Sequence, residues 1–161
     1  MIVIRRLQVG EGALFRGIRL AALKADPKAF GSSYESALKR TSESWDAQAD
    51  ASAAGDLRAT FLAFDGESAI GITAFYRDAS DPSRGELIQV WVDARFRGTG
   101  LAGRLMEDSL SWARAVGVEV ALAGVSTTNH RVIAFYEKHG FEHVSALSVD
   151  DTTYLQKSLS R

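Results

Sequence analysis

The sequence has no cysteine among its 161 residues. This absence excludes disulfide bonds, thiolate metal sites and cysteine nucleophiles. A strong excess of one charge is also missing, because 19 lysines and arginines face 20 aspartates and glutamates, for a net charge of −1. Since nucleic acids are bound mainly through basic patches, we expect no nucleic-acid partner.

Long apolar runs are absent as well. No stretch reaches the roughly 18 to 20 apolar residues that cross a bilayer, and the first six residues lack the charged-then-apolar layout of a signal peptide. We therefore expect no membrane partner and a cytoplasmic protein. His139 and His143 suggest a metal, but Gly140 and Phe141 between them indicate a helix end. Because no acidic or histidine cluster completes a ligand set, we expect no metal.

The length and the hydrophobic content of the chain, 46%, suit one well-buried core and are too small for two ordinary domains. We predict a single domain over residues 1–161. Hydrophobic periodicity and turn signals predict a mixed α+β sheet, with Ser42 capping one of the helices. The predicted strands are 2–7, 58–64, 69–76, 86–93, 119–125, 141–149 and 152–159, and the predicted helices are 12–24, a polar segment after 35, 42–54, 98–116 and 129–139.

The junction after the 86–93 strand has the composition of a phosphate-binding loop. Gly98 and Gly100 let the backbone turn tightly and approach a ligand, and the N–H groups of the following helix attract negative charge. Arg95 and Arg97 add charge-assisted donors beside it. The glycine spacing fits neither a Walker A loop nor a dinucleotide fingerprint.

Two motifs resemble those of the GCN5-related N-acetyltransferase (GNAT) family. Arg95, Gly98 and Gly100 match its acetyl-CoA pyrophosphate loop, Gln/Arg-x-x-Gly-x-Gly/Ala. Further along, residues 129–141 match Asn-x-x-Ala-x-x-Phe-Tyr-x-x-x-Gly-Phe, with Val132 in place of Ala. The resemblance implies a mixed, mostly antiparallel sheet of about seven strands flanked by about four helices. In that fold the parallel strands Glu86–Val92 and Glu119–Val125 splay apart.

The resemblance also implies that acetyl-CoA is the cosubstrate, bound by the strand, the loop and the second motif. The residues so implied are Val90, Trp91, Val92, Arg97, Gly98, Thr99, Gly100, Leu101, Ala102, Asn129 and Tyr136. A plain strand-to-helix turn is the alternative interpretation of the loop. Asn129 also suits the first position of a helix, and the two roles are compatible.

Two residues match catalytic positions of the family. Tyr136 matches the general acid that protonates the thiolate of CoA, and a phenol with a reference pKa of about 10 is protonated at neutral pH. Glu86 matches the glutamate base of some members. For each an alternative stays open, since Tyr136 with Phe135 would also suit a helix core, and Glu86 would also suit a solvated strand end.

The acceptor side is expected in the loop between the first two helices, where Phe30, Tyr34 and Glu35 are candidates. The alternative is that the two aromatic rings only fasten this loop to the sheet. The activity implied is transfer of acetyl to a primary amine, preferably a small molecule, in a ternary complex. Protein N-terminal or lysine acetylation and a non-catalytic acyl-CoA sensor are alternatives. The family's frequent homodimers and the length of the acyl group stay open.

Overall fold

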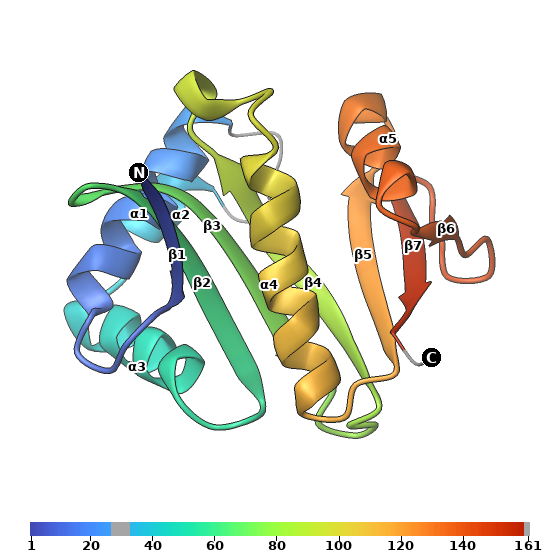
Figure 1. Cartoon of the computed structure of the whole chain (residues 1–161), viewed down its shortest axis with the longest axis horizontal. Helices are drawn as coiled ribbons and strands as arrows, with labels where there is room; N and C mark the ends of the chain where they lie inside the picture. Colours follow the sequence, from blue (N-terminus) through green and yellow to red (C-terminus); the bar gives the residue numbers. More distant parts are fainter. Residues whose placement is uncertain (27–32, 160–161) are drawn as a thin grey trace.

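The computed structural model describes residues 1–26 and 33–159, and in this part of the chain seven strands form one sheet (Figure 1). The sheet order is β1-β2-β3-β4-β5-β7-β6, and every neighbouring pair is antiparallel except β4 with β5. The mixed, mostly antiparallel sheet is therefore as expected. The strands are β1 (Ile2–Arg6), β2 (Arg58–Asp65), β3 (Ser68–Arg77), β4 (Arg84–Val92), β5 (Val120–Ser126), β6 (Glu142–His143) and β7 (Thr152–Ser158).

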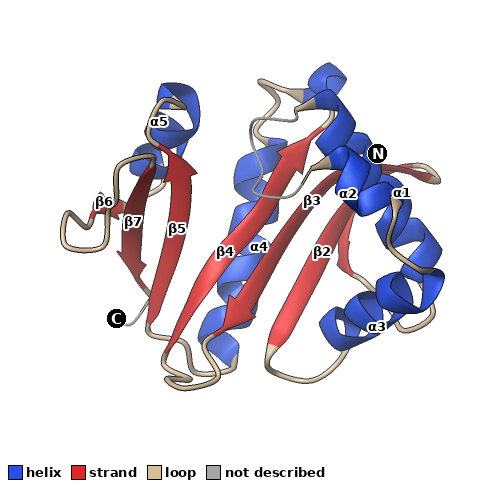
Figure 2. Cartoon of the chain, turned by 180° about the vertical axis from the view of Figure 1, so that it is seen from behind, coloured by secondary structure: helices blue, strands red, loops and turns tan. Residues whose placement is uncertain are grey.

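Helices cover both faces of the sheet (Figures 1 and 2). The described residues form five α-helices and one 3-10 turn, because the polar segment after Ser33 forms a short helix of its own. The elements are α1 (Gly12–Ala25), α2 (Tyr34–Leu38), α3 (Ser42–Ala53), η1 (Ala94–Phe96), α4 (Leu101–Ala115) and α5 (His130–Lys138). Figure 2 shows α1, α2 and α3 on one face over β2 and β3, with α4 on the other.

Alternation along the strands divides the core between these two faces. Leu62 of β2 and Ile72 of β3 pack with Phe15 of α1 and Trp45 of α3. Phe75, Leu87, Ala121 and Ala123 face the opposite side, where they pack with Met106 and Leu110 of α4 and Tyr136 of α5. Because side chains alternate across a strand, each strand of the middle of the sheet contributes to both cores.

The parallel pair in the middle of the sheet is short. β4 and β5 are paired at only three positions, Arg84 with Val120, Gly85 with Ala121, and Glu86 with Leu122. Beyond Glu86 the two strands diverge (Figure 2). The predicted splay is thus present, and it begins at the residue predicted to be a catalytic base.

A β-bulge in β4 was not predicted. Ile72 pairs with Trp91 and Ala74 pairs with Ile88, so Thr73 alone faces both Gln89 and Val90. Gln89 has a φ of 60°, the one positive φ of a non-glycine residue in the described chain. An extra residue in one strand bends it locally and turns a side chain in a new direction.

One predicted helix start and one predicted cap residue are wrong. The helix expected from residue 98 begins at Leu101, because Gly98 and Gly100 have φ values of 80° and 84° and cannot continue a right-handed helix. The residue that caps α3 is Thr41 and not Ser42, since the hydroxyl of Thr41 accepts a hydrogen bond from the Ser44 N–H at 3.1 Å. Ser42 is the first helical residue.

The predicted 141–149 strand is also wrong for most of its length. Glu142 and His143 pair with β7, Val149 forms an isolated bridge to Thr152, and the chain between them turns. The Ser148 hydroxyl accepts a hydrogen bond from the Tyr154 N–H at 3.1 Å and donates one to the Val144 carbonyl. This side chain therefore takes the place of a ladder partner, and β7 instead pairs along its whole length with β5.

Candidate active site

A cleft of about 1010 Å³ opens where β4 and β5 diverge. Its walls are formed by β4, the loop before α4, the first turn of α4, the end of β5 and α5, together with part of α1. The cleft brings the two sequence motifs together. All the predicted cofactor residues except Thr99 line it, namely Val90, Trp91, Val92, Arg97, Gly98, Gly100, Leu101, Ala102, Asn129 and Tyr136.

The N-terminus of α4 forms one end of the cleft. Gly100 is its N-cap residue and contributes no side-chain hydrogen bond, so the first-turn N–H groups are left without a side-chain cap. A Cβ atom built on Gly98 or Gly100 has no described neighbour within 4 Å, so the left-handed backbone, and not lack of space, favours glycine there. Thr99 supports the turn, because its hydroxyl donates to the Phe96 carbonyl. This end suits an anionic group.

Asp26, at the end of α1, holds two residues of this wall in place. Its carboxylate accepts hydrogen bonds from Arg97 and from the indole N–H of Trp91, each at 2.7 Å. Arg97 is therefore oriented by an ion pair with α1. Arg95 pairs with Asp93, and its side chain is 74% exposed. Sequence analysis did not identify Asp26.

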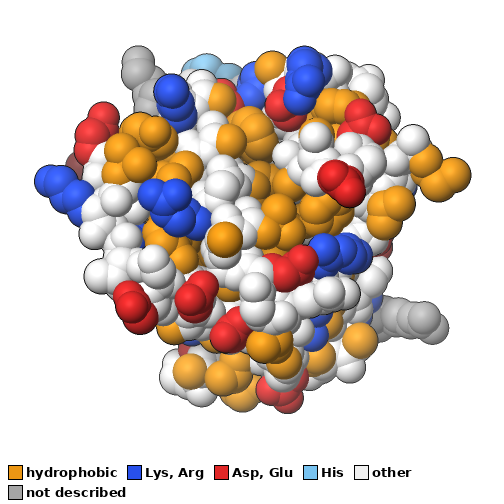
Figure 3. Space-filling view, turned by 90° about the vertical axis from the view of Figure 1, so that its left-hand side faces the viewer, with side chains coloured by type: hydrophobic (Ala, Val, Ile, Leu, Met, Phe, Trp, Pro, Cys, Tyr) orange, Lys and Arg blue, Asp and Glu red, His pale blue; other side chains and the backbone are white. Residues whose placement is uncertain are grey.

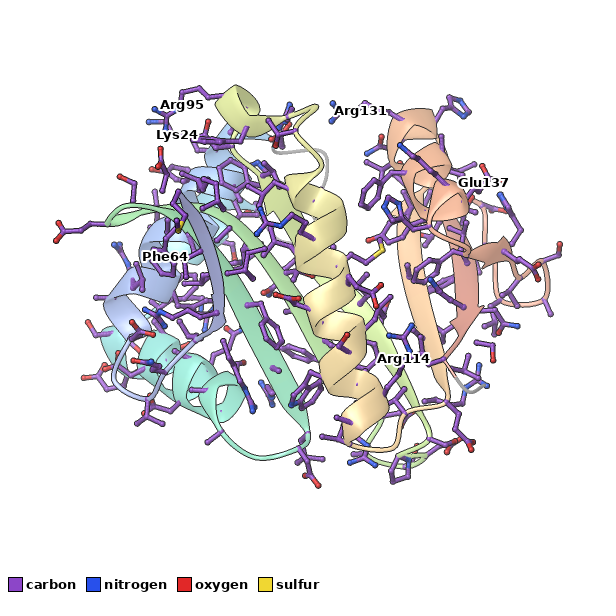
Figure 4. The ribbon with its side chains drawn as sticks, in the orientation of Figure 1. Lys24, Phe64, Arg95, Arg114, Arg131 and Glu137 are labelled. Carbon is purple, nitrogen blue, oxygen red and sulfur yellow. The ribbon has the colours of Figure 1, made fainter. Side chains whose placement is uncertain are left out.

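The opposite wall is the face of α5. Asn129 caps this helix, with its side-chain oxygen accepting from the Val132 N–H at 3.3 Å, and it also lines the cleft. Arg131, Lys138 and His139 line the same wall, and Figure 4 shows Arg131 extending from α5 toward the loop before α4. The cations Arg131 and Lys138 make the cleft more attractive to a phosphate-bearing ligand.

The backbone of β4 forms the floor of the cleft. Since the ladder to β5 ends at Glu86, the backbone groups of Val90 and Val92 make no ladder hydrogen bonds in that direction. Backbone donors and acceptors at such a position can pair with a ligand that lies along the strand.

Tyr136 lines the cleft, whereas Glu86 is not among the described lining residues and lies at the point where the two strands separate. Tyr136 is 5% exposed, and its ring packs edge-on against Phe135 and Phe141. Burial, with a further contribution from the negative charge of Glu86, raises the pKa of Tyr136 well above its usual value. Burial also raises the pKa of Glu86, which is half-buried. Because a Cβ on Gly124 would lie 3.4 Å from a carboxylate oxygen of Glu86, glycine there leaves room for that group.

Two further polar residues line the cleft that sequence analysis missed. Arg19 lies on the buried face of α1 and is 6% exposed, and the side-chain oxygen of Gln89 is buried without a hydrogen-bond partner among the described residues. Signals for both exist in the sequence. Arg19 occupies a position in the apolar stripe of an amphipathic helix, and Gln89 is the polar residue inside the apolar run of β4.

The predicted acceptor residues are not brought together at the cleft. Phe30 lies outside the described residues. Tyr34 starts α2, packs beside the α1 core and has the Lys24 ammonium 6.0 Å from its ring centroid, while Glu35 is exposed. Neither is among the described residues that line the cleft. Their role at an acceptor site stays a prediction.

A second, shallower hollow lies at the β1 edge of the sheet. Val3, Leu14 and Phe64 line it, and Figure 3 shows hydrophobic side chains exposed on this side of the molecule. Its arginine, Arg5, is already paired with Glu11 at 2.7 Å and stacked on Phe64. Tyr136 and the uncapped helix start are in the larger cleft, which is therefore the candidate active site.

Residues 1–26 and 33–159 lack two features, a cluster of metal ligands and a membrane-spanning helix. No group of three or more histidine, aspartate or glutamate side chains in this part of the chain is arranged to hold a metal ion. His143 instead lies 3.5 Å from Glu137. Within the same residues, no helix has both the length and the hydropathy needed to cross a membrane.

Solved structures share this fold over nearly the whole chain. A GNAT-family acetyltransferase from Streptococcus pneumoniae is 23% identical with a TM-score of 0.81, and the match covers 99% of this chain and 100% of that one. A putative acetyltransferase from Salmonella typhimurium, solved with its cofactor acetyl-CoA, is 19% identical with a TM-score of 0.76, covering 99% and 94%. An N-acetyltransferase from Thermoplasma acidophilum in complex with coenzyme A is 16% identical, also at 0.76, covering 98% and 99%.

The sequence itself carries the family assignment. No curated protein matches the chain. The model of the acetyltransferase (GNAT) family, however, matches residues 22–141. This range runs from the last turn of α1 through α5 and contains both motifs. The structural likenesses, all below 25% identity, concern the fold and agree with this match. The chain therefore belongs to the GNAT family of acetyltransferases.

Proposed function

We propose that residues 1–161 form one N-acetyltransferase domain that moves an acetyl group from acetyl-CoA to a primary amine of a small molecule. The observation that carries this proposal is the continuity of the cleft. It joins an uncapped helix start, an unpaired strand edge and Tyr136 in a single space, and Glu86 lies where β4 and β5 separate. A phosphate-bearing thioester and a second substrate would meet there directly, without a covalent enzyme intermediate.

The cleft residues fit the parts of acetyl-CoA. The first-turn amides of α4 and those of the preceding loop, from Arg97 to Ala102, would hold the pyrophosphate. The free edge of β4 at Val90 and Val92 would pair with the amide groups of the pantetheine arm, and Asn129 would contact it from α5. The amide N–H and C=O groups of that arm can pair with the backbone C=O and N–H groups on the free edge of the strand.

The reaction needs a proton acceptor for the amine and a proton donor for the leaving thiolate. The amine nitrogen forms a bond to the acetyl carbon while the carbon–sulfur bond breaks. Glu86 takes the proton that the amine loses, directly or through water, and the Tyr136 phenol gives its proton to the sulfur. The raised pKa makes the Glu86 carboxylate more basic, and the Tyr136 phenol is protonated at neutral pH.

The alternatives differ in what else the chain should do. A non-catalytic acyl-CoA sensor would need the donor half of the cleft only, and the buried Tyr136 beside Glu86 favours catalysis over it. Acetylation of a protein N-terminus or lysine would use the same chemistry. The acceptor panel below separates these activities.

The direct test is acetyl-CoA-dependent thiol release with amines of several classes and a no-amine control. Amino acids, polyamines, aminoglycosides and short peptides are offered in parallel, and mass spectrometry locates the acetyl group. Because the chain has no cysteine, it adds no thiol background. Amine-dependent release with an N-acetylated small product supports the proposal. Saturable acetyl-CoA binding with no release for any amine would overturn it in favour of a sensor.

A further inference from the structure

Arg19 is a charged residue in a place that usually holds an apolar one. It follows Phe15 and Ile18 on the face of α1 that packs on the sheet, and only 6% of it is exposed. It also lines the cleft, on the α1 side and across from the residues of β4. A guanidinium in the wall of a ligand cleft is a candidate group for binding an anionic part of a ligand.

Arg19 keeps its positive charge although it is buried. Burial lowers its pKa to about 10, the charge of Arg40 acts in the same direction, and Tyr76 acts in the opposite direction. The guanidinium therefore still carries its charge at neutral pH. The Tyr76 hydroxyl accepts a 2.9 Å hydrogen bond from Gln48, and the Arg58 guanidinium lies 4.7 Å from the Tyr76 ring centroid. An anionic ligand group would be attracted to Arg19.

Gln89 offers the complementary group. Its side-chain oxygen is buried and lacks a hydrogen-bond partner among the described residues, and it lines the same cleft. The left-handed backbone at Gln89 is strained for a non-glycine residue, and such strain is concentrated at functional sites. An amide oxygen accepts hydrogen bonds from an amine, whereas a guanidinium fork matches a carboxylate.

Building on the proposed N-acetyltransferase function, we propose that the acceptor is an amine that also carries a carboxylate, with Arg19 binding the carboxylate and Gln89 accepting from the amine. The acceptor class is thus a free amino acid. A polyamine or an aminoglycoside, whose charged groups are all cationic, would be repelled by the Arg19 guanidinium. Arg19 and Gln89 are substrate-binding residues in this scheme, and the proton transfers stay with Glu86 and Tyr136.

The test compares each free L-amino acid with its carboxamide as acceptor. The two differ only in the carboxylate. The amine of the carboxamide is the more acidic of the two, so a larger fraction of it is neutral at pH 7, and reactivity alone favours the carboxamide. We expect kcat/KM to be at least about 10-fold higher for the preferred amino acid than for its carboxamide, since charge-assisted pairing is the stronger kind of hydrogen bond.

Variants of α1 then assign the effect to Arg19. Arg19→Met keeps the length and apolar packing of the side chain but removes the charge, and should raise KM for the amino acid by about 10- to 100-fold while leaving the carboxamide nearly unchanged. Arg19→Lys should recover part of the loss, because it restores charge without the planar fork. Arg16→Met is the matched control, since Arg16 is exposed on the same helix.

The outcomes separate this inference from the proposed function. No thiol release with any amine overturns the proposed function, and this inference with it. Release at equal kcat/KM for acids and carboxamides overturns only this inference. A parallel loss for both acceptors in Arg19→Met, or a loss of acetyl-CoA affinity or melting temperature, would mean that Arg19 is structural and would also overturn it. Loss of the acid preference alone supports it.

Discussion

Two residues at the splay, Tyr136 and Glu86, are proposed to have different chemical tasks. Tyr136 and Glu86 both have a raised pKa, in each case chiefly because burial disfavours the charged form. For the phenol, the neutral form that burial favours is the proton donor. For the carboxylate, burial strengthens the base and shifts its titration toward the pH at which amines are acetylated. Placing both groups at the point of splay therefore lets one partly buried site serve two proton transfers.

Replacing Tyr136 with Phe tests its proposed role as the proton donor. The substitution keeps the ring, and hence the packing against Phe135 and Phe141, and removes only the hydroxyl. We expect kcat to fall by about 10- to 100-fold, with little change in the melting temperature or in the affinity for acetyl-CoA. Steady-state kinetics and calorimetry measure these quantities. Unchanged kcat with lowered stability would mean that Tyr136 is a core residue only.

Replacing Glu86 with Gln tests its proposed role as the proton acceptor. Wild-type kcat/KM should rise with pH as Glu86 loses its proton, and the variant should lack this limb of the pH profile. At pH 7 we expect a loss of about 100-fold in kcat/KM. An unchanged pH profile would contradict the assignment of Glu86 as the base.

The same substitution has a predicted effect on stability. Because the pKa of Glu86 is raised on folding, the folded chain binds this proton more tightly than the unfolded chain. The stability that the proton contributes is complete below the unfolded pKa and is lost as the pH rises through the folded pKa. At pH 7, Glu86→Gln should therefore melt at the same temperature as wild type or higher, and below the reference pKa of 4.5 it should have no such advantage. A lower melting temperature at pH 7 would contradict this.

At the scale of elements, the start of α4 is the proposed binding site for the pyrophosphate of acetyl-CoA, so changes there should alter the affinity for acetyl-CoA. Gly100→Asp places a carboxylate where the pyrophosphate is proposed to bind, and Gly100→Asn places a neutral group of the same shape there. Both residues tolerate the left-handed conformation at φ 84° better than most, and both can cap a helix. The two variants should therefore differ in charge and little in folding.

We expect Gly100→Asp to weaken CoA binding by about 100-fold relative to Gly100→Asn. Two like charges about 4 Å apart cost on the order of 4 kcal/mol near a protein surface, more than this ratio requires. Isothermal titration with CoA measures both dissociation constants. Equal constants for the two variants would remove the pyrophosphate from the α4 N-terminus.

The elements also show what the sequence can predict. Strands with clear alternation and helices with caps, such as α5 after Asn129, were predicted to within a residue or two. The left-handed turn at Gly98 and Gly100 was mistaken for helix because glycine permits both conformations. The bulge at Gln89 could not be predicted, since it depends on the register with β3 and glutamine has no preference for φ 60°. The loss of the 144–149 strand depends on one hydroxyl, that of Ser148.

The site residues follow the same division. The residues predicted from the two motifs, Arg97–Ala102 and Asn129 with Tyr136, line the cleft apart from Thr99, because each motif is contiguous in the sequence. Arg19 and Asp26 reach the cleft from α1, on the other side of two further helices and two strands in the sequence. Only tertiary packing brings them to β4, so the spacing within the sequence does not reveal them.

For the whole molecule, the weak point of the sheet coincides with the proposed donor site. β4 and β5 share three paired positions, and past these the β1–β4 part and the β5–β7 part are separated by the cleft. Met106 and Leu110 of the long helix α4 pack in one core with Ala121 of β5. In this way α4 joins the two parts of the sheet at their paired end. A ligand that contacts β4, α4 and α5 together would join them at the open end as well.

Acetyl-CoA should therefore stabilise the whole molecule and protect the open end most. At a ligand concentration of about 100 times Kd, binding adds about 2.7 kcal/mol, which for a chain of this size raises the melting temperature by roughly 5 to 10 °C. Hydrogen exchange should slow in the β4 segment 87–92 and at 123–126 of β5, where no β4–β5 ladder exists without the ligand. Gly100→Asp, which should bind the ligand poorly, is the control and should show neither change. A thermal shift without protection of these segments would place the ligand outside the splay, whereas protection confined to them would locate it between the two parts of the sheet.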